Sequence, residues 1–226
     1  MSHPSSYFFD FSHFEHNTLF HNDPFPWLVL QKLATYLKEQ PLGIIKGIIS
    51  PAAYLINPEQ ISIGEGSVVE PGAYIQGPCI IGKDCVVRHG AYIRGNVLTG
   101  DGCVIGHDTE VKHSIFLNLA HAAHFAYVGD SILGNEINLG AGTICANLKL
   151  DQSPITLRFQ EKSIQTQMRK LGAIIGDKTQ IGCNTVCNPG TLLGKEVLCN
   201  PCLNIQGFIP SRSRIKPSVK PVIHSY

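Results

Sequence analysis

Three side chains near the middle of the chain have the types and the spacing of a site that handles a charged substrate. Arg94 and Lys112 are separated by 18 residues, and His124 follows Lys112 by 12 more. Two cations that share one ridge repel each other unless an anion lies between them, and a phosphate group can bind both. A neutral histidine is the usual general base near pH 7. The three residues therefore predict a site that binds a phosphate and removes a proton near it.

Two simpler interpretations of these residues stay open at this point. A lysine and an arginine on a polar ridge are usually just solvated, and the chain contains ten histidines, so a histidine by itself is a weak signal. His121 and His124 also form an HxxH pair, which could bind a metal ion. Spacing alone does not decide among the catalytic, the solvated and the metal-binding interpretation.

A repeat of six residues runs through most of the chain and must position these side chains. Large aliphatic residues or cysteines recur at every sixth position and are often followed by glycine. The first block comprises Ile63, Val69, Ile75, Ile81, Val87 and Ile93, then Ile105, Val111, Leu117 and Ala123, and, after two five-residue steps, Val128, Leu133, Leu139 and Cys145. The second block comprises Ile175, Ile181, Cys187, Leu193, Cys199 and Ile205. We expect these residues to point inward.

A period of six matches neither an amphipathic helix nor a single half-buried strand. It matches a short strand followed by a tight corner, and three such sides make one triangular coil of roughly 18 residues. Coils of this kind stack through backbone hydrogen bonds into a solenoid. The repeat therefore predicts an all-β solenoid, a parallel β-helix, in which Arg94 and Lys112 lie on the same corner of adjacent coils.

The segments outside the repeat predict flanking structure. Apolar residues at helical spacing within 24–40 predict a short amphipathic helix, which we expect to cap the first coil. Residues 148–171 break the repeat and alternate over Ile155, Leu157 and Phe159, as a small hairpin would. We thus expect an N-terminal extension over 1–42, the β-helix over 43–209 with an inserted loop at 148–171, and an irregular tail over 210–226.

Charge and composition exclude several classes of protein. The net charge is only +1, without the clustered basic excess that nucleic-acid binding needs. No run of 18 apolar residues is present and residues 1–21 lack the pattern of a signal peptide, so we expect no membrane association. Only 15% of the residues are charged, which suits a protein that buries a flat apolar face against symmetric copies of itself. We expect a homotrimer.

The eight cysteines fit the repeat better than they fit a metal site. Six of them take inward positions, at residues 79, 85, 103, 145, 187 and 199. Buried, unpaired cysteines act as small hydrophobic residues and are typical of a reducing cytoplasm, where we expect the protein to reside. Cys199 and Cys202 have CxxC spacing and could bind zinc together with Cys183 and Cys187, but packing explains Cys187 and Cys199 more simply. We therefore expect no metal.

A longer pattern surrounds the histidine. Residues 124–130 read His-Phe-Ala-Tyr-Val-Gly-Asp and residues 138–143 read Asn-Leu-Gly-Ala-Gly-Thr. With Arg94, Glu110, Lys112 and Asn147 at their distances from His124, this pattern resembles the acetyltransferase domain of the bifunctional N-acetylglucosamine-1-phosphate uridyltransferases, over residues 60–210. Residues 169–177, Arg-Lys-Leu-Gly-Ala-Ile-Ile-Gly-Asp, resemble a relative of that domain in archaeal-type sugar-phosphate nucleotidyltransferases. The resemblance implies a left-handed β-helix and a trimer with its active sites between subunits.

The resemblance also implies a reaction, the transfer of acetyl from acetyl-CoA to the amine of glucosamine 1-phosphate, which serves nucleotide-sugar and cell-envelope precursor synthesis. It implies that His124 is the general base and that Asn147 positions the acetyl carbonyl. The sugar phosphate would be bound through its phosphate by two cations and a tyrosine and oriented by two further residues. These implied substrate-binding residues are Arg94, Lys112 and Tyr127, and Glu110 and Asn138.

The sequence departs from the family at the acyl donor site. Ala141 matches a small residue that lines the CoA site of the family, whereas Cys183 replaces a serine and Pro201 an alanine. The loop at 148–171 is longer than its counterpart, so a further phosphate-binding lysine of the family is not placed. No Gly-rich nucleotide loop precedes the repeat, and we therefore expect no pyrophosphorylase activity.

Three functions remain in competition on the sequence alone. The first is a hexapeptide-repeat N-acetyltransferase that acts on a hexosamine 1-phosphate with acetyl-CoA. The second is a non-enzymatic trimer that binds a sugar phosphate or serves as a scaffold for a separate sugar nucleotidyltransferase. The third is a metal hydrolyase like the γ-class carbonic anhydrases, which share the β-helix, although the histidines here do not show the ligand motifs of that family.

Overall fold

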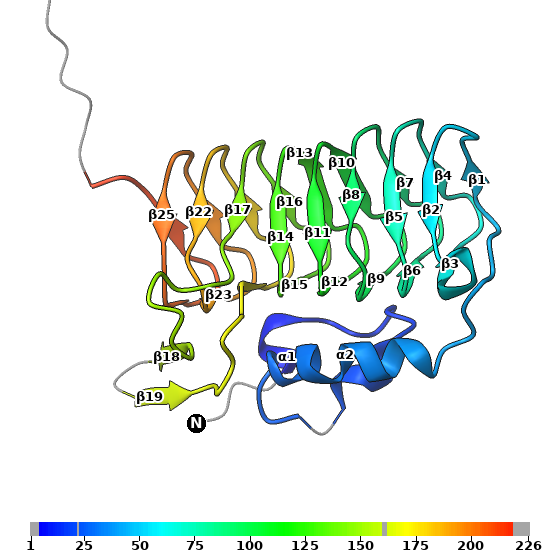
Figure 1. The fold of residues 1–226 in the computed structure, drawn as a ribbon. Helices are drawn as coiled ribbons and strands as arrows, with labels where there is room; N and C mark the ends of the chain where they lie inside the picture. Colours follow the sequence, from blue (N-terminus) through cyan, green and yellow to red (C-terminus); the bar gives the residue numbers. More distant parts are fainter. Residues whose placement is uncertain (1–4, 22, 160–161, 219–226) are drawn as a thin grey trace, which may run out of the picture.

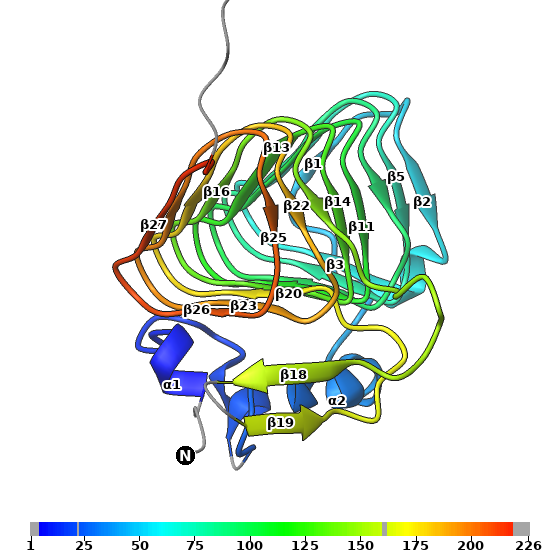
Figure 2. The same ribbon diagram turned by 90° about the vertical axis from the view of Figure 1, so that its left-hand side faces the viewer.

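The computed structural model describes residues 5–21, 23–159 and 162–218, and most of these wind into a three-sided parallel β-solenoid (Figure 1). Each full coil contributes a short strand to each of three parallel sheets, which we name face A, face B and face C. The chain passes from face B to face C to face A in every coil, so the solenoid has three rows of corners, the B–C, C–A and A–B corners. Figure 2 shows the triangular coils from the end. The predicted all-β solenoid is confirmed.

The strands are short because each side of a coil ends at a corner. Face A consists of β3 (Ile61–Ile63), β6 (Cys79–Ile81), β9 (Val97–Thr99), β12 (Ser114–Phe116), β15 (Ile132–Leu133), β20 (Ala173–Ile175), β23 (Thr191–Leu193) and β26 (Phe208–Ile209). Face B consists of β1 (Ile48–Ile49), β4 (Val68–Val69), β7 (Val86–Val87), β10 (Val104–His107), β13 (His121–His124), β16 (Asn138–Leu139), β21 (Gln180–Ile181), β24 (Leu198–Cys199) and β27 (Arg214–Ile215). Face C consists of β2 (Tyr54–Ile56), β5 (Tyr74–Gln76), β8 (Tyr92–Ile93), β11 (Glu110–Lys112), β14 (Tyr127–Gly129), β17 (Ile144–Cys145), β22 (Val186–Cys187) and β25 (Asn204–Ile205).

The interior of the solenoid is one continuous hydrophobic core. It contains most residues of the six-residue repeat, from Ile63 to Ile205. The six cysteines that the repeat predicts to point inward are all buried. Burial raises the pKa of the Cys79 thiol, and it raises the pKa of Cys199 to about 11. These cysteines pack as small hydrophobic residues.

The first five-residue step of the repeat comes earlier in the chain than the sequence pattern predicted. Leu117 and Ala123 continue the six-residue spacing in the sequence, but in the structure Phe116 and Ala122 belong to the interior core. The first five-residue step therefore separates Val111 from Phe116. Phe116 and Leu117 are both apolar, as are Ala122 and Ala123, so the sequence pattern does not show which residue of each pair points inward. The pairing of β12 with β9 and of β13 with β10 determines which residue of each pair points inward.

Face A is buried on both sides, because the N-terminal segment covers its outer surface (Figures 1 and 2). The outward residues of face A pack into a second hydrophobic cluster with the N-terminal segment. This cluster includes Ile80, Leu98, Ile115, Ile132, Ile174 and Leu192 from the solenoid and Phe8, Phe9, Phe14, Trp27, Leu30 and Leu33 from the N-terminal segment. The flat apolar face that we expected to meet symmetric copies is thus covered by the chain itself.

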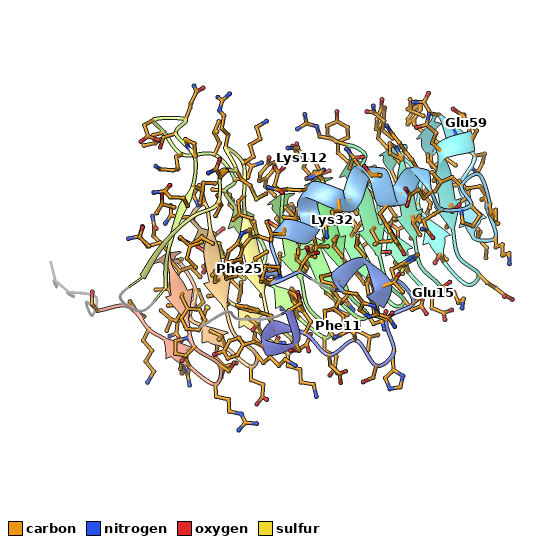
Figure 3. The ribbon with its side chains drawn as sticks, turned by 90° about the horizontal axis from the view of Figure 1, so that it is seen from below. Phe11, Glu15, Phe25, Lys32, Glu59 and Lys112 are labelled. Atoms are coloured by element: carbon orange, nitrogen blue, oxygen red, sulfur yellow. The ribbon has the colours of Figure 1, made fainter. Side chains whose placement is uncertain are left out.

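Hydrogen bonds fix the N-terminal segment at the A–B corner. The backbone N–H of Asp10 donates to Asp177 Oδ2 at 2.7 Å, and Asn135 Nδ2 donates to the Asp10 carbonyl at 2.8 Å. Asn118 Nδ2 donates to the carbonyl of His13 at 2.8 Å. Figure 3 views this side of the molecule and shows the N-terminal segment, with Phe11 and Phe25 labelled, lying across the strands.

The predicted amphipathic helix is present as α2 (Leu28–Lys38), but it runs alongside several coils and does not cover the end of the first one (Figure 1). Its buried residues Leu30, Leu33 and Leu37 have helical spacing. This apolar stripe meets the apolar outer residues of face A, which explains the position of the helix. Shorter helical turns are α1 (Ser5–Phe8), η1 (Asn17–Phe20) and η2 (Pro58–Gln60). In the described ranges no helix is long and apolar enough to span a membrane.

The loop that interrupts the repeat forms an antiparallel pair of strands, β18 (Thr156–Phe159) and β19 (Lys162–Gln165). It lies on the same side as α2 (Figure 2), and Ile155 and Leu157 join the second hydrophobic cluster. The tail predicted as irregular from residue 210 onward is instead partly regular, because β27 continues face B beside β24. Residues 219–226 of that tail lie outside the described residues.

The cover over face A predicts a large stability cost for a substitution beneath it. Leu98 points away from the interior core and is buried only because the N-terminal segment lies on it. We expect Leu98→Ala to lower the free energy of unfolding by about 2–5 kcal/mol, as for other fully buried leucines. Leu150→Ala is the matched control, since Leu150 is fully exposed and its loss should change stability by less than about 0.5 kcal/mol. Equal urea midpoints for the two variants would contradict the assigned packing.

Candidate active site

Four of the five predicted substrate-binding residues, Arg94, Glu110, Lys112 and Tyr127, lie on the outer surface of face C. Tyr92, Glu110 and Tyr127 are paired in register on adjacent strands, and each points outward because the residue after it points into the core. Arg94 and Lys112 follow inward residues at the C–A ends of β8 and β11. The five side chains therefore form one patch over three adjacent coils.

Arg94 is already paired with a carboxylate. Its Nη1 donates to Glu110 Oε1 at 2.6 Å, and its guanidinium carbon lies 5.8 Å from the ring centroid of Tyr92. The hydrogen bond to Glu110 raises the pKa of Arg94. The side chain of Arg94 is 43% exposed and that of Glu110 34% exposed, so solvent or a competing anion can reach this ion pair.

Lys112 is paired more deeply. Its Nζ donates to Asp130 Oδ2 at 2.8 Å, and the side chains of Lys112 and Asp130 are only 19% and 8% exposed. Asn147 Nδ2 donates to the same carboxylate oxygen. Asp130 thus joins a cation and an amide that come from different coils, and it fixes the position of both side chains.

A glycine makes room for the two polar groups that lie over the centre of this patch. A Cβ atom at Gly129 would lie 2.7 Å from both Tyr127 Oη and Asn147 Nδ2. Burial, and then the negative charges of Glu110 and Asp130, raise the pKa of Tyr127, so its phenol stays protonated near neutral pH. Tyr127 and Asn147 therefore present hydrogen-bond donors side by side above Gly129.

Asp130 is the residue whose role sequence reasoning missed. It stands in the quoted Gly-Asp motif, but no function was assigned to it. A partial signal was available in its spacing, because Asp130 follows Lys112 by 18 residues, and in the structure Asp130 comes directly after Gly129, the register partner of Lys112. An acid and a base at that spacing are expected to meet across the ladder.

His124 lies on a different edge, the B–C corner, in a row of equivalent residues from successive coils. It is paired in register with His107. Backbone bonds continue the row, since the carbonyls of His124, Ala141 and Cys183 accept the N–H groups of Gly142, Asn184 and Cys202. The row reads, coil by coil, His89, His107, His124, Ala141, Cys183 and Pro201. The predicted base and the three predicted CoA-site residues therefore occupy adjacent positions of one corner.

Two of the predicted residues are not brought to the patch within one chain. His124 is separated from Arg94 and Lys112 by the width of face C, because β14 runs from the B–C corner to the C–A corner. Asn138 lies on face B, where it is paired with His121 and Gln180. A single copy of the chain thus holds the cations and the imidazole at opposite edges of one face.

The cysteines considered for zinc do not converge. Cys187 and Cys199 are buried, whereas Cys183 and Cys202 are exposed at the B–C corner. Within residues 5–21, 23–159 and 162–218, no three His, Cys, Asp or Glu side chains form a group that could hold a metal ion.

Comparison with known proteins identifies relatives of the solenoid. A family model described as the GMPPB C-terminal domain matches residues 75–153, which include most of the patch. The bifunctional protein GlmU of Methanococcus maripaludis is 41% identical over 90 residues, which are 40% of this chain and 22% of that protein. The chain thus spans about a fifth of the length of the bifunctional relatives that it matches.

Two further relatives cover most of the chain. The structure of UDP-N-acetylglucosamine acyltransferase from Francisella novicida superposes with a TM-score of 0.53, with 13% identity over 75% of this chain and 67% of that one. Structural relatives of this type are left-handed β-helices, which confirms the predicted hand. YaiX of Escherichia coli, an uncharacterised protein named as an acetyltransferase, is 32% identical over 189 residues, 82% of this chain and 81% of its own length. The chain therefore belongs to the hexapeptide-repeat acyltransferases, as a relative of the acetyltransferase domain of the GlmU-type enzymes.

Proposed function

We propose that this protein is an N-acetyltransferase that transfers the acetyl group of acetyl-CoA to the amine of a hexosamine 1-phosphate, with glucosamine 1-phosphate as the substrate. The observation that carries the proposal is the combination of two paired cations on face C with an exposed imidazole that heads a row of small side chains. In this role the protein would act in the cytoplasm, in nucleotide-sugar and cell-envelope precursor synthesis.

The phosphate of the sugar would bind at the C–A edge of face C. Arg94 offers a planar guanidinium that binds phosphate through two parallel hydrogen bonds, and Lys112 offers an ammonium one coil away. Both cations are neutralised in the free protein, by Glu110 and Asp130. The phosphate would displace the exposed Glu110 from Arg94, and the freed carboxylate would accept hydrogen bonds from sugar hydroxyls. Asp130, which is more deeply buried, would stay with Lys112.

The chemical step needs a base, a positioned carbonyl and a leaving thiol. The neutral amine of the sugar attacks the thioester carbonyl carbon, the C–S bond breaks, and coenzyme A leaves as the thiol. His124 would take the proton that the amine loses and return it to the departing sulfur. Asn147 would orient the acetyl carbonyl, while Tyr127 and Asn138 would hold the sugar. Alignment of these groups supplies the rate acceleration, and no metal enters the step.

The acyl donor would lie along the B–C corner. Ala141, Cys183 and Pro201 follow His124 in successive coils, and their small side chains leave room for an extended pantetheine arm along the row. An arm in that position would end with its thioester next to His124. This arrangement supports acetyl-CoA as the donor and gives the two departures from the family pattern, Cys183 and Pro201, a common location.

A homotrimer would complete the site. The imidazole and the cations lie at opposite edges of face C, so a second copy must present its B–C corner to the C–A edge of the first. Face A is covered by the N-terminal segment, which leaves faces B and C for contacts between copies. Exposed apolar side chains on these two faces, Ile48, Tyr54, Tyr92, Ile144 and Leu198, are suited to such contacts.

One observation favours a second function, a non-enzymatic trimer that serves as a scaffold for a separate sugar nucleotidyltransferase. Arg94 and Lys112 already have carboxylate partners, and a face with satisfied charges needs no ligand. Release of coenzyme A from acetyl-CoA in the presence of glucosamine 1-phosphate separates the two functions, because a scaffold would not consume the thioester.

The first prediction of this proposal concerns the base. We expect His124→Ala to lower kcat for coenzyme A release by about two to four orders of magnitude with an unchanged thermal midpoint, because proton transfer is lost and the exposed side chain contributes little to packing. His121→Ala, at the start of the same strand, is the control and should keep most of the activity. Full activity of His124→Ala would exclude the imidazole as the base.

The second prediction concerns the phosphate. We expect Arg94→Ala and Lys112→Ala each to weaken binding of glucosamine 1-phosphate by about 1.5–3 kcal/mol, with little effect on the KM for acetyl-CoA. The double variant should lose less than the sum, because one anion bridges both cations. The decisive measurement compares glucosamine 1-phosphate with glucosamine. A variant that prefers the phosphorylated sugar as strongly as the parent would show that the phosphate binds elsewhere.

The third prediction tests whether two copies share one site. His124→Ala and Lys112→Ala chains carrying different affinity tags can be co-expressed, and mixed assemblies isolated through both tags. If each site takes His124 from one copy and Lys112 from its neighbour, each mixed trimer should contain one intact site, about a third of its sites. Mixed assemblies that are no more active than either variant alone would place both residues in one subunit and remove this argument for the trimer.

A further inference from the structure

The corner next to His124 forces an unusual backbone on a bulky residue. At the B–C corner the position that follows the row residue has a positive φ in seven successive coils. The values are 76° at Gly72, 73° at Gly90, 49° at Asp108, 46° at Phe125, 74° at Gly142, 54° at Asn184 and 59° at Cys202. Glycine, asparagine and aspartate enter this region readily, whereas a large side chain there is an outlier that costs stability.

Burial does not compensate for this cost at Phe125. Its side chain is 54% exposed, so little of the apolar area that would favour a phenylalanine is removed from water. Strain that is not repaid by packing tends to accumulate at functional sites. The contacts of the ring indicate what the strained residue does.

The ring of Phe125 lies between two imidazoles of the corner row. Its centroid is 5.4 Å from that of His107, in an edge-to-face arrangement with the planes at 76°. It is 5.9 Å from the centroid of His124, with the planes at 47°. Phe125 thus connects the candidate base to the next histidine in the row.

His107 is a fixed support for that ring. Its Nδ1 donates to the carbonyl of His89 at 3.2 Å, and its Nε2 lies 3.2 Å from Asp108 Oδ2. It also stacks on His89, with centroids 5.7 Å apart and planes at 12°. His89 in turn is tied through its Nδ1 to the carbonyl of Pro71 at 2.8 Å.

His124 has no comparable support from polar groups. Among the described residues, no carboxylate or carbonyl accepts a hydrogen bond from its imidazole, although a general base is normally oriented by such a partner. Among the described residues, the ring contact of His124 is with Phe125.

We propose that Phe125 is a positioning residue: held in a left-handed backbone conformation between His107 and His124, it fixes the imidazole of His124 in the orientation that accepts the proton. This role rests on the proposed function of His124 as the base. Strain at the corner is retained because a smaller residue there would leave the imidazole free to rotate.

The chain contains a matched control for the backbone effect. Leu119 lies six residues earlier in the same coil, at the A–B corner, with φ 59° and a side chain that is 50% exposed. Leu119 has the same left-handed backbone conformation and a similar exposed fraction, but it lies at a different corner from His124. Asparagine is compatible with this backbone at both positions.

We expect Phe125→Asn and Leu119→Asn both to raise Tm by about 2–4 °C, because each replaces a large side chain in the left-handed region. Only Phe125→Asn should lower kcat, by about 10- to 100-fold, while the KM for acetyl-CoA stays within about twofold. Phe125→Tyr keeps the aromatic ring and should restore at least half of the parent kcat. A parent-like kcat for Phe125→Asn overturns the proposal, as does an equal loss in Leu119→Asn.

Two further measurements separate this role from others. Sedimentation of Phe125→Asn should match the parent, and dissociation into smaller species would assign Phe125 to contacts between copies instead. NMR of histidine-labelled protein without substrate should show a fixed ring for His124, with a contact to the ring of Phe125, in the parent and in Leu119→Asn. In Phe125→Asn the imidazole should be rotationally averaged. If the parent lacks acyltransferase activity, the proposed function fails, but this spectrum still decides whether Phe125 orients His124, and a fixed ring in Phe125→Asn overturns that role.

Discussion

The backbone ladder between successive coils is the constraint on which the rest of the structure depends. Each short strand is paired in parallel with its equivalents one coil before and one coil after, so every outward side chain lies directly above another at the same position. The ladder converts sequence spacing into rows: His107, His124 and Ala141 become neighbours, as do Tyr92, Glu110 and Tyr127. Side chains that act together on this fold therefore lie in rows parallel to the solenoid axis, and the residues of one site are about one coil apart in the sequence.

The covering of face A determines which surfaces remain for function. The aromatic N-terminal segment and the inserted hairpin bury the outer side of this face, so it has a core on both sides, as parallel sheets usually do. Contacts with substrates or other copies are left to faces B and C. Face C carries the paired charges, and face B meets face C at the corner of His124. The charged pairs and the imidazole therefore lie on the surface that the N-terminal segment leaves uncovered.

The charges of face C are balanced within the chain before any ligand arrives. The pairing of Arg94 with Glu110 and of Lys112 with Asp130 keeps four ionisable groups in place without an unpaired charge in the partly buried region around Asp130. The two pairs differ in exposure, and this difference assigns them different tasks. The Arg94–Glu110 pair is open to solvent, whereas Asp130 of the more buried pair holds Lys112 and Asn147 in fixed positions.

The sequence by itself determined the solenoid, its coil length, the inward cysteines and the stacking of Arg94 above Lys112, because a six-residue period has few other structural solutions. It could not determine the phase between Val111 and Val128, since Phe116 and Leu117 are both apolar and Ala122 and Ala123 are identical, so either member could point inward. Only the pairing of β13 with β10 settled that choice and placed His124 at the corner beside His107. The tertiary structure alone also decided that the aromatic N-terminal segment lies along face A, because an amphipathic helix specifies an apolar partner but not its location. Hydrogen-bond register and long-range burial involve residues far apart in the chain, and local patterns carry no information about either.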